Sequence, residues 1–309
     1  MDVIQKQADA LTNLRGEPAK NRYAFIDILK IVGILFVLAE HLGPYYVFPF
    51  TNYLNVALGK MYEFNFGSIG ITLFLLASGC SLYLTHPTVG TRQQAKDFYL
   101  KRGLRIYPIY WLAIVFALVW QPFRLQQTFI AVDMVKLVSG FQSLGAQSHV
   151  DFWGLVNGNF WFLTILLSLY LLYPVISLAF KKNPHATFAL LIAISIVSRY
   201  VMSNAATYFM GIYWMPLCWL PEFALGIYLL KLGVKPKTQS TKMLLFFGNF
   251  SFYLYLINQP ILQSFNLEQN ILLFGVILFF CGCLFYFVDK NSKQALPDSY
   301  AKSNKSKQA

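Results

Sequence analysis

Four residues that could take part in chemistry lie within one apolar stretch, "YAFIDILKIVGILFVLAEHLGPYY", at residues 23–46. They are Asp27, Lys30, Glu40 and His41. An ionisable side chain inside a bilayer is costly, so such residues usually mark a site that uses them. A neutral histidine is well suited to accept a proton near pH 7. The alternative is a buried histidine that only bonds a neighbouring helix.

Helical spacing places three of these residues on one stripe. At about 100° per residue, Lys30 and His41 lie almost above one another, and Asp27 falls within about 60° of both. The rise of about 1.5 Å per residue separates His41 from Lys30 by roughly 16 Å. The stripe indicates a polar bundle interior, although Asp27 and Lys30 could also form a purely structural pair. Glu40, adjacent to His41, is expected to modulate His41 or to line the same cavity.

A second group of candidates lies in "FYLKRGLRIYPIYW", residues 98–111. Arg102 and Arg105 are one helical turn apart at the mouth of an expected membrane span. Two guanidinium groups on one face suit a phosphate. The alternative is ordinary anchoring by positive charges at the cytoplasmic side. Beside a polar stripe that enters from the same side, the pair predicts a phosphate-bearing cytosolic donor.

The elements that must position these residues are membrane helices. Of 309 residues, 57% are hydrophobic and only 12% are charged, which exceeds the apolar share of a soluble domain. Apolar stretches long enough to cross a bilayer predict an all-α, multi-pass bundle of eight to ten spans. The segment 124–142 is mixed and fits a short span, a re-entrant helix or an interfacial helix. The eight clear spans are expected at 23–42, 66–86, 106–122, 159–180, 186–203, 210–230, 243–263 and 269–288.

The formal net charge of +12 comes from basic clusters in the tails and in the loops near 87–105 and 231–242. This positive-inside pattern predicts that both termini are cytoplasmic and that the basic residues meet membrane lipids. Nucleic acid is not expected as a partner, because the aromatic residues lie within the spans. We expect a cytoplasmic tail at 1–22, a membrane domain at 23–289 and a basic, disordered cytoplasmic tail at 290–309, in a cell-membrane protein.

The four cysteines do not form a metal-binding pattern. Cys281 and Cys283 are two positions apart on an expected helix, so their side chains point in different directions. All four lie in apolar stretches, where cysteine acts as a small packing residue. No metal site is expected.

The motifs, taken in order, resemble the acyltransferase 3 family of integral membrane acyltransferases. "IDILKIVGILFVLAEH" is similar to the first-helix motif of that family, in which an arginine precedes the catalytic histidine. His41 matches the histidine, and Lys30 stands in place of the arginine. "KRGLR" matches the Arg-x-x-Arg motif through Arg102 and Arg105.

Further motifs extend the resemblance to about residue 265. "GSIGITLFLLASGCSLYL" is similar to the second helix through Ser78, and "FWFLTILLSLYLLYP" is similar to the tryptophan helix through Trp161. "LPEFALGIYL" and "GNFSFYLYLINQP" resemble the late helices and contain Glu222 and Asn258. Glu222 could line the cavity or be structural. Asn258 stands where the family often has a histidine, and it could also satisfy backbone groups freed by the following proline.

The resemblance implies a donor, an acceptor and roles for these residues. The donor is acetyl-CoA or another acyl-CoA, used as a co-substrate, with no tightly bound cofactor. The acceptor is a hydroxyl of a carbohydrate or lipid-linked glycan. Arg102 and Arg105 would hold the CoA phosphates, Lys30 would line the donor channel, and His41 would act as general base. An acyl-histidine intermediate stays open.

Two other classes of protein are alternatives to a membrane acyltransferase. A transporter or channel could use Asp27, Lys30 and His41 as a proton or solute path. The sequence lacks the paired Gly- or Pro-broken helices typical of transporters. A non-catalytic membrane scaffold would leave the polar stripe without a purpose.

Overall fold

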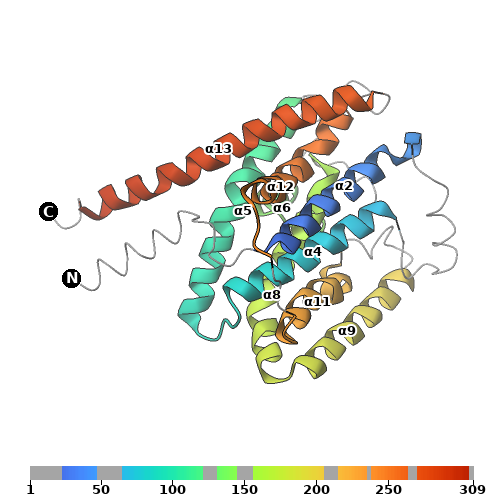
Figure 1. Cartoon of the computed structure of the whole chain (residues 1–309), viewed down its shortest axis with the longest axis vertical. Coiled ribbons are helices and arrows are strands. Elements are labelled where there is room, and N and C mark those ends of the chain that lie inside the picture. Colours follow the sequence, from blue (N-terminus) through green and yellow to red (C-terminus); the bar gives the residue numbers. More distant parts are fainter. Residues whose placement is uncertain are drawn as a thin grey trace.

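The structure is a computed structural model that describes residues 23–46, 65–120, 131–144, 156–204, 215–234, 238–263 and 270–305. In these ranges the chain forms helices joined by short connections, without a β-sheet (Figure 1). The expected all-α fold is therefore confirmed. The elements are α2 (Ala24–Tyr46), α4 (Phe66–Thr85), α5 (Arg92–Trp120), α6 (Ala131–Ser139), η3 (Gly158–Phe160, a 3-10 helix), α8 (Trp161–Lys182), α9 (Pro184–Asn204), η4 (Pro216–Trp219, a 3-10 helix), α11 (Leu220–Lys231), α12 (Lys242–Leu262) and α13 (Ile271–Lys305).

Five of the described helices are long and apolar enough to cross a membrane: α4, α5, η3 with α8, α9, and α13 as far as residue 291. A crossing takes about 20 such residues. Helices α2 and α12 have similar lengths, 23 and 21 residues, and they carry Asp27, Lys30, Glu40, His41 and Asn258. The chain is a multi-pass membrane protein.

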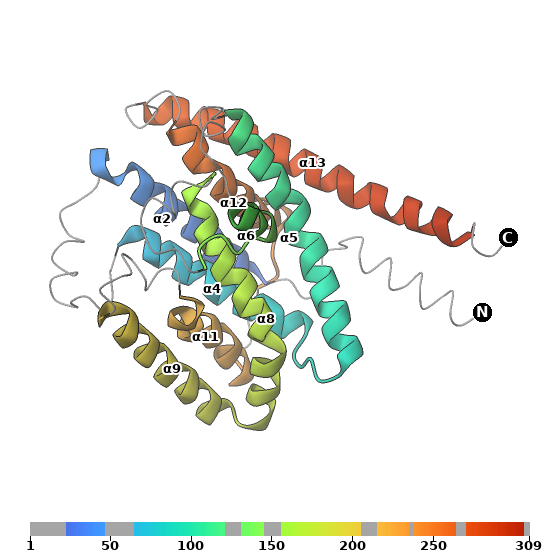
Figure 2. The ribbon, with the colours of Figure 1, turned by 180° about the vertical axis from the view of Figure 1, so that it is seen from behind.

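The helices form an inner and an outer group. Helices α9 and α13 lie at opposite edges of the bundle, with α2, α4 and α12 between them (Figures 1 and 2). In the most apolar stretch of α9 and of α13, 22% of the residues are buried, against 50% in α4 and 56% in η3 with α8. Helices α4 and α8 therefore bury a larger share of their residues than α9 and α13 do.

Glycines let α4 approach both of its neighbours closely. A Cβ added at Gly70 would lie 2.6 Å from the carbonyl oxygen of Gly33 on α2. A Cβ at Gly226 of α11 would overlap the carbonyl oxygen of Leu76 on α4. Small residues at helix contacts are the usual means of close packing in membranes. This packing fixes α2, which carries His41, against α4.

Helix α5 begins at Arg92, fourteen residues before the expected span at 106–122. The expected loop near 87–105 is therefore helical from residue 92 onward. Its start has a physical cause. The backbone N–H of Gln94 donates to Thr91 Oγ1 at 3.2 Å, and the backbone N–H of Thr91 donates to Gln94 Oε1 at 3.2 Å. This reciprocal capping box starts a helix, and residues 92–105 contain good helix formers.

Other expected elements differ in extent. The expected span at 210–230 is divided into η4 and the 12-residue α11, each of which begins with a proline near its N-terminus; proline suits a first turn but not a helix interior. Within 124–142 the described helix is the short α6. Helix α13 continues to Lys305, beyond residue 290, where the expected basic tail begins. The expected tail at 1–22 lies outside the described residues.

Candidate active site

His41 lies near the end of α2, where α2 meets α12 and η3. Its Nδ1 is 2.7 Å from Oδ1 of Asn258 on α12. The same oxygen accepts a hydrogen bond from Asn159 Nδ2 on η3, at 2.9 Å. Both asparagine side chains are buried, with exposed fractions of 0% for Asn258 and 2% for Asn159. The structure therefore brings together two predicted site residues, His41 and Asn258, from opposite ends of the chain.

The hydrogen bonds of Asn258 determine the tautomer of His41. Asn258 Nδ2 donates to the carbonyl oxygens of Leu254 and Tyr255, at 3.0 and 2.8 Å. Those two acceptors identify the amide nitrogen, so Oδ1 is the atom that faces His41. An amide oxygen only accepts hydrogen bonds, so His41 Nδ1 carries the proton and Nε2 keeps its lone pair. A neutral imidazole held in this tautomer can act as a base at Nε2.

Asp27 and Lys30 lie at the other end of α2. Asp27 Oδ1 is 3.7 Å from Lys30 Nζ; the Asp27 side chain is fully buried, and that of Lys30 is 17% exposed. Asp27 Oδ2 accepts a hydrogen bond from Ser240 Oγ at 2.6 Å. Gly248 of α12 packs directly on this carboxylate, because a Cβ there would lie 2.8 Å from Asp27 Cγ. The one-turn ion pair considered from sequence is present within α2, and the Ser240 hydrogen bond joins Asp27 to the segment that leads into α12.

Arg102 is half-buried and lies over aromatic rings at the end of α4. Its Cζ is 5.8 Å from the ring centroids of Phe98 and Tyr170, and its Nη2 donates to Thr85 Oγ1 at 3.1 Å. The Tyr170 hydroxyl is 2.8 Å from Ser78 Oγ, which links a second predicted residue to this cluster. Among the described residues, none bonds the buried Nε of Arg102. The guanidinium therefore keeps a donor for an anionic ligand.

Arg105 has a different environment from Arg102. It is exposed, one turn further along α5. Sequence spacing predicts two equivalent arginines on one face, but the structure gives them different settings. Arg102 is fixed by its stacking and hydrogen bond, whereas Arg105 keeps the freedom of a surface side chain.

His86 follows α4 and contacts the Arg102 cluster from outside the membrane-spanning helices. Thr85 Oγ1 donates to the Ser81 carbonyl oxygen at 2.8 Å. It therefore accepts from His86 Nδ1, which lies 2.9 Å away. Burial, together with the positive charges of Arg102 and Lys101, lowers the pKa of His86 to about 4. His86 is therefore neutral at pH 7, and the charge of this cluster comes from its arginine.

Glu40 and Trp161 are placed at the His41 end of the bundle. Glu40 Oε2 accepts a hydrogen bond from the Gly67 N–H, at 3.3 Å, in the first turn of α4. A carboxylate at this position is favoured by the positive end of the helix dipole. Trp161 is partly buried, and its ring centroid is 6.1 Å from that of Trp219. Glu40 thus contributes to helix packing beside His41 rather than bonding it.

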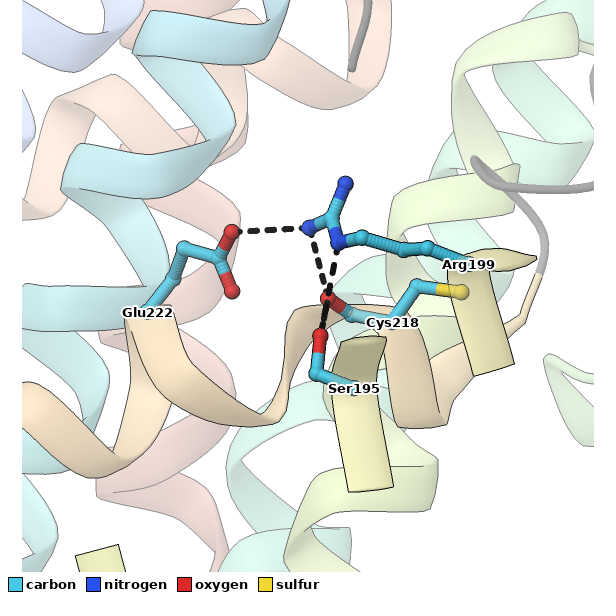
Figure 3. Close-up of polar contacts among 4 residues, drawn as sticks. All are labelled: Ser195, Arg199, Cys218 and Glu222. Carbon is cyan, nitrogen blue, oxygen red and sulfur yellow. Dashed lines mark hydrogen bonds and ion pairs between the residues drawn. The ribbon is translucent and has the colours of Figure 1, made fainter. Parts of the chain in front are cut away.

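Glu222 forms an ion pair with a residue that the sequence reading did not select, Arg199 (Figure 3). Arg199 Nη2 is 2.9 Å from Glu222 Oε1 and 2.6 Å from the Cys218 carbonyl oxygen. Arg199 Nε donates to Ser195 Oγ at 3.3 Å, and Ser195 Oγ donates to the same carbonyl at 2.7 Å. The pair is nearly buried, with 10% and 12% of the two side chains exposed. It ties α9 to η4 and α11.

A sequence signal for Arg199 existed, but none existed for Asn159. Arg199 is the only charged residue in the expected span 186–203, and a lone charge in an apolar span needs a partner. Glu222 in the following span was the nearest acid. Asn159 lies in a polar turn, and nothing local shows that it bonds a residue about a hundred positions away.

Comparison with known proteins gives one match. No curated protein and no solved structure matches the chain. The model of the acyltransferase 3 family, described as an acyltransferase domain, matches residues 23–288. That range extends from α2 to the apolar part of α13 and covers nearly the whole chain. The chain therefore belongs to the acyltransferase 3 family and is a membrane acyltransferase.

Proposed function

We propose that this enzyme moves an acetyl group from acetyl-CoA to a hydroxyl of a carbohydrate or lipid-linked sugar, with His41 as general base. The donor approaches from the cytosol, and the acceptor faces outward across the cell membrane. The observation that carries the proposal is the bond between His41 Nδ1 and Asn258 Oδ1. It leaves Nε2 as the basic atom of a histidine inside an apolar bundle.

In the proposed reaction, His41 Nε2 removes the proton of the acceptor hydroxyl. The hydroxyl oxygen forms a bond to the thioester carbonyl carbon, and the carbon–sulfur bond then breaks. The imidazolium returns its proton to the CoA sulfur, which leaves as the thiol. Asn258 Oδ1 accepts the hydrogen bond from His41 Nδ1 throughout. Asn258 therefore orients the ring and stabilises the charged imidazolium. General base catalysis of this kind contributes about 10²–10⁴-fold.

The donor residues lie at the opposite end of α4 from His41. Gly67, bonded to Glu40 beside His41, and Thr85, bonded to Arg102, are separated by 18 residues along α4. That is about 27 Å of helix. An extended pantetheine arm is suited to such a span, with its phosphates near Arg102 and Arg105 and its thioester near His41. Lys30, between the two ends, would line the arm.

The test of the proposal is His41→Ala in the purified enzyme. Acetyl transfer should fall by at least about 100-fold, while the unfolding temperature in detergent stays close to that of the parent. His185→Ala is the matched control, because His185 bonds Tyr228 on the surface. Near-parental transfer by His41→Ala would remove His41 from the reaction.

The two arginines offer a second test, because the structure separates their environments. Arg102→Gln should weaken CoA binding and also lower stability, since it removes the stacking on Phe98 and Tyr170. Arg105→Gln should weaken CoA binding alone, and less so at high salt, because an exposed charge is screened. Titration of CoA against each variant at two ionic strengths measures this. Unchanged CoA affinity in both variants would mean that the arginines only anchor the protein at the membrane surface.

A further inference from the structure

The carboxylate of Glu222 uses only one of its two oxygens. Oε1 receives the hydrogen bond from Arg199, at 2.9 Å. Oε2 is buried, and no described residue donates to it. An ion pair in a low-dielectric interior stabilises a protein only if its remaining lone pairs also form hydrogen bonds. Buried polar atoms without partners are rare. Oε2 is therefore a buried acceptor atom whose lone pairs the described residues leave open.

The ring of Trp219 packs against this ion pair, and the ring of Trp161 lies beyond it. Arg199 Cζ lies 5.7 Å from the Trp219 ring centroid, and Trp219 is 2% exposed. Trp161, partly buried, lies beside Trp219 at a ring-centroid distance of 6.1 Å. Ligand sites combine such rings with a few convergent polar groups. A carboxylate oxygen that accepts a hydroxyl hydrogen, next to an indole face that packs on ring carbons, suits a polyhydroxylated ring.

The chain connects this cluster directly to the base. Trp161 is the first residue of α8 and follows η3. Asn159 Nδ2 of η3 donates a hydrogen bond to Asn258 Oδ1, the same oxygen that accepts the hydrogen bond from His41 Nδ1. The segment from η3 to the start of α8 therefore contacts both groups, through Asn159 at Asn258 and through Trp161 at Trp219.

We propose that Glu222, Arg199 and Trp161 form the acceptor-binding site of the enzyme. Glu222 Oε2 accepts a hydrogen bond from one hydroxyl of a sugar-like acceptor, and another hydroxyl of that acceptor is presented to His41. The positive charge of Arg199 favours the ionised form of Glu222 and its hydrogen bond orients the carboxylate, so both act as positioning residues. This inference rests on the proposed function, from which it takes the acceptor. It adds where that acceptor binds and why several hydroxyls are required.

The test uses the full-length protein in a detergent without a sugar head group, since such head groups would compete. The probe is methyl glucoside, with cyclohexanol as its single-hydroxyl counterpart, and binding is followed by tryptophan fluorescence. Methyl glucoside should bind saturably, and cyclohexanol should not. Glu222→Gln places an amide nitrogen where Oε2 stood and should weaken glucoside binding by roughly 10-fold or more, as expected for a lost bond to a charged group.

Asp289→Asn is the matched control. Asp289 is a buried acid bonded by Tyr253 at 2.7 Å, between α12 and α13. Its change removes a buried carboxylate far along the chain from the Glu222 cluster, and glucoside affinity should stay at the parental value. If Glu222→Gln does not fold because Arg199 loses its partner, the double variant Arg199→Met with Glu222→Gln carries no charge there. It should fold and show the same loss of binding.

The outcomes separate this inference from the proposed function. Parental glucoside affinity in Glu222→Gln, or no binding by the parent, would show that the ion pair is structural only. If His41→Ala keeps acetyl transfer, the proposed chemistry fails regardless of glucoside binding. If His41→Ala abolishes transfer and Glu222→Gln leaves glucoside binding intact, only the acceptor site is wrong.

Discussion

The Asp27–Lys30 pair joins residues one turn apart on α2, whereas the Arg199–Glu222 pair joins α9 to α11. In the first pair the acid is fully buried, the lysine is 17% exposed, and the two charged atoms are 3.7 Å apart. In the second pair both side chains are nearly buried and the atoms are 2.9 Å apart. The arginine also holds a carbonyl oxygen and a serine hydroxyl.

The difference shows two ways to keep charge inside an apolar bundle. The lysine is a compact point charge that can turn toward a ligand, because its acid has a second donor in Ser240. The arginine is a planar group with several fixed donors, and its bonds assemble three segments of the chain. The first pair leaves its cation partly free to move, and the second fixes both charges in place.

The largest loss of stability is expected from Arg199→Met. It leaves Glu222 buried without its cation and removes the bonds to Ser195 and to the Cys218 carbonyl. Loss of one partner of a buried pair costs about 3–5 kcal/mol. The free energy of unfolding in mixed micelles measures the loss. The double variant Arg199→Met with Glu222→Met should recover most of it, because no charge is left buried.

A somewhat smaller loss, about 3 kcal/mol at the lower end of the same range, is expected from Lys30→Met. Asp27 would lose its cation but keep the Ser240 hydroxyl. Asp27→Asn combined with Lys30→Met should restore stability but not acetyl transfer, and Lys30→Arg should retain both. Full transfer by the double variant would show that this pair is structural and has no part in donor binding.

Gly248→Ala should destabilise the enzyme by about 2 kcal/mol, the usual cost of overpacking. The added Cβ would overlap the Asp27 carboxylate and push α12 away from α2. Gly275→Ala in α13 is the control, since nothing lies within 4 Å of a Cβ there, and it should be neutral or stabilising. Equal effects at the two sites in mixed-micelle unfolding would contradict the close packing of α12 on Asp27.

The smallest effect, about 1 kcal/mol, is expected from Ser240→Ala, which removes one hydrogen bond to Asp27. Ser240 is only half-buried, so water can replace its hydroxyl. Acetyl transfer should fall by less than in Lys30→Met. A loss of stability as large as that of Lys30→Met would mean that Ser240, rather than the lysine, holds the carboxylate in place.

Features contained within one helix were predictable, because helical geometry fixes them. The spacing of Lys30 and His41 sets their angle and rise on α2, and the one-turn spacing of Asp27 and Lys30 allows their pair. The Thr91–Gln94 capping box also marks the start of α5 in the sequence. The residue types and their order further indicated an acyltransferase 3 protein, which the family match confirms.

Which helices meet was decided only by the tertiary structure. The bond between His41 and Asn258 spans 217 positions, and no periodicity within α2 or α12 specifies it. The same holds for Asn159, for the Arg199–Glu222 pair and for the different settings of Arg102 and Arg105. The physical reason is that a helix repeat fixes which face a side chain occupies. The partner of that face depends on how closely the helices pack, here at Gly70, Gly226 and Gly248.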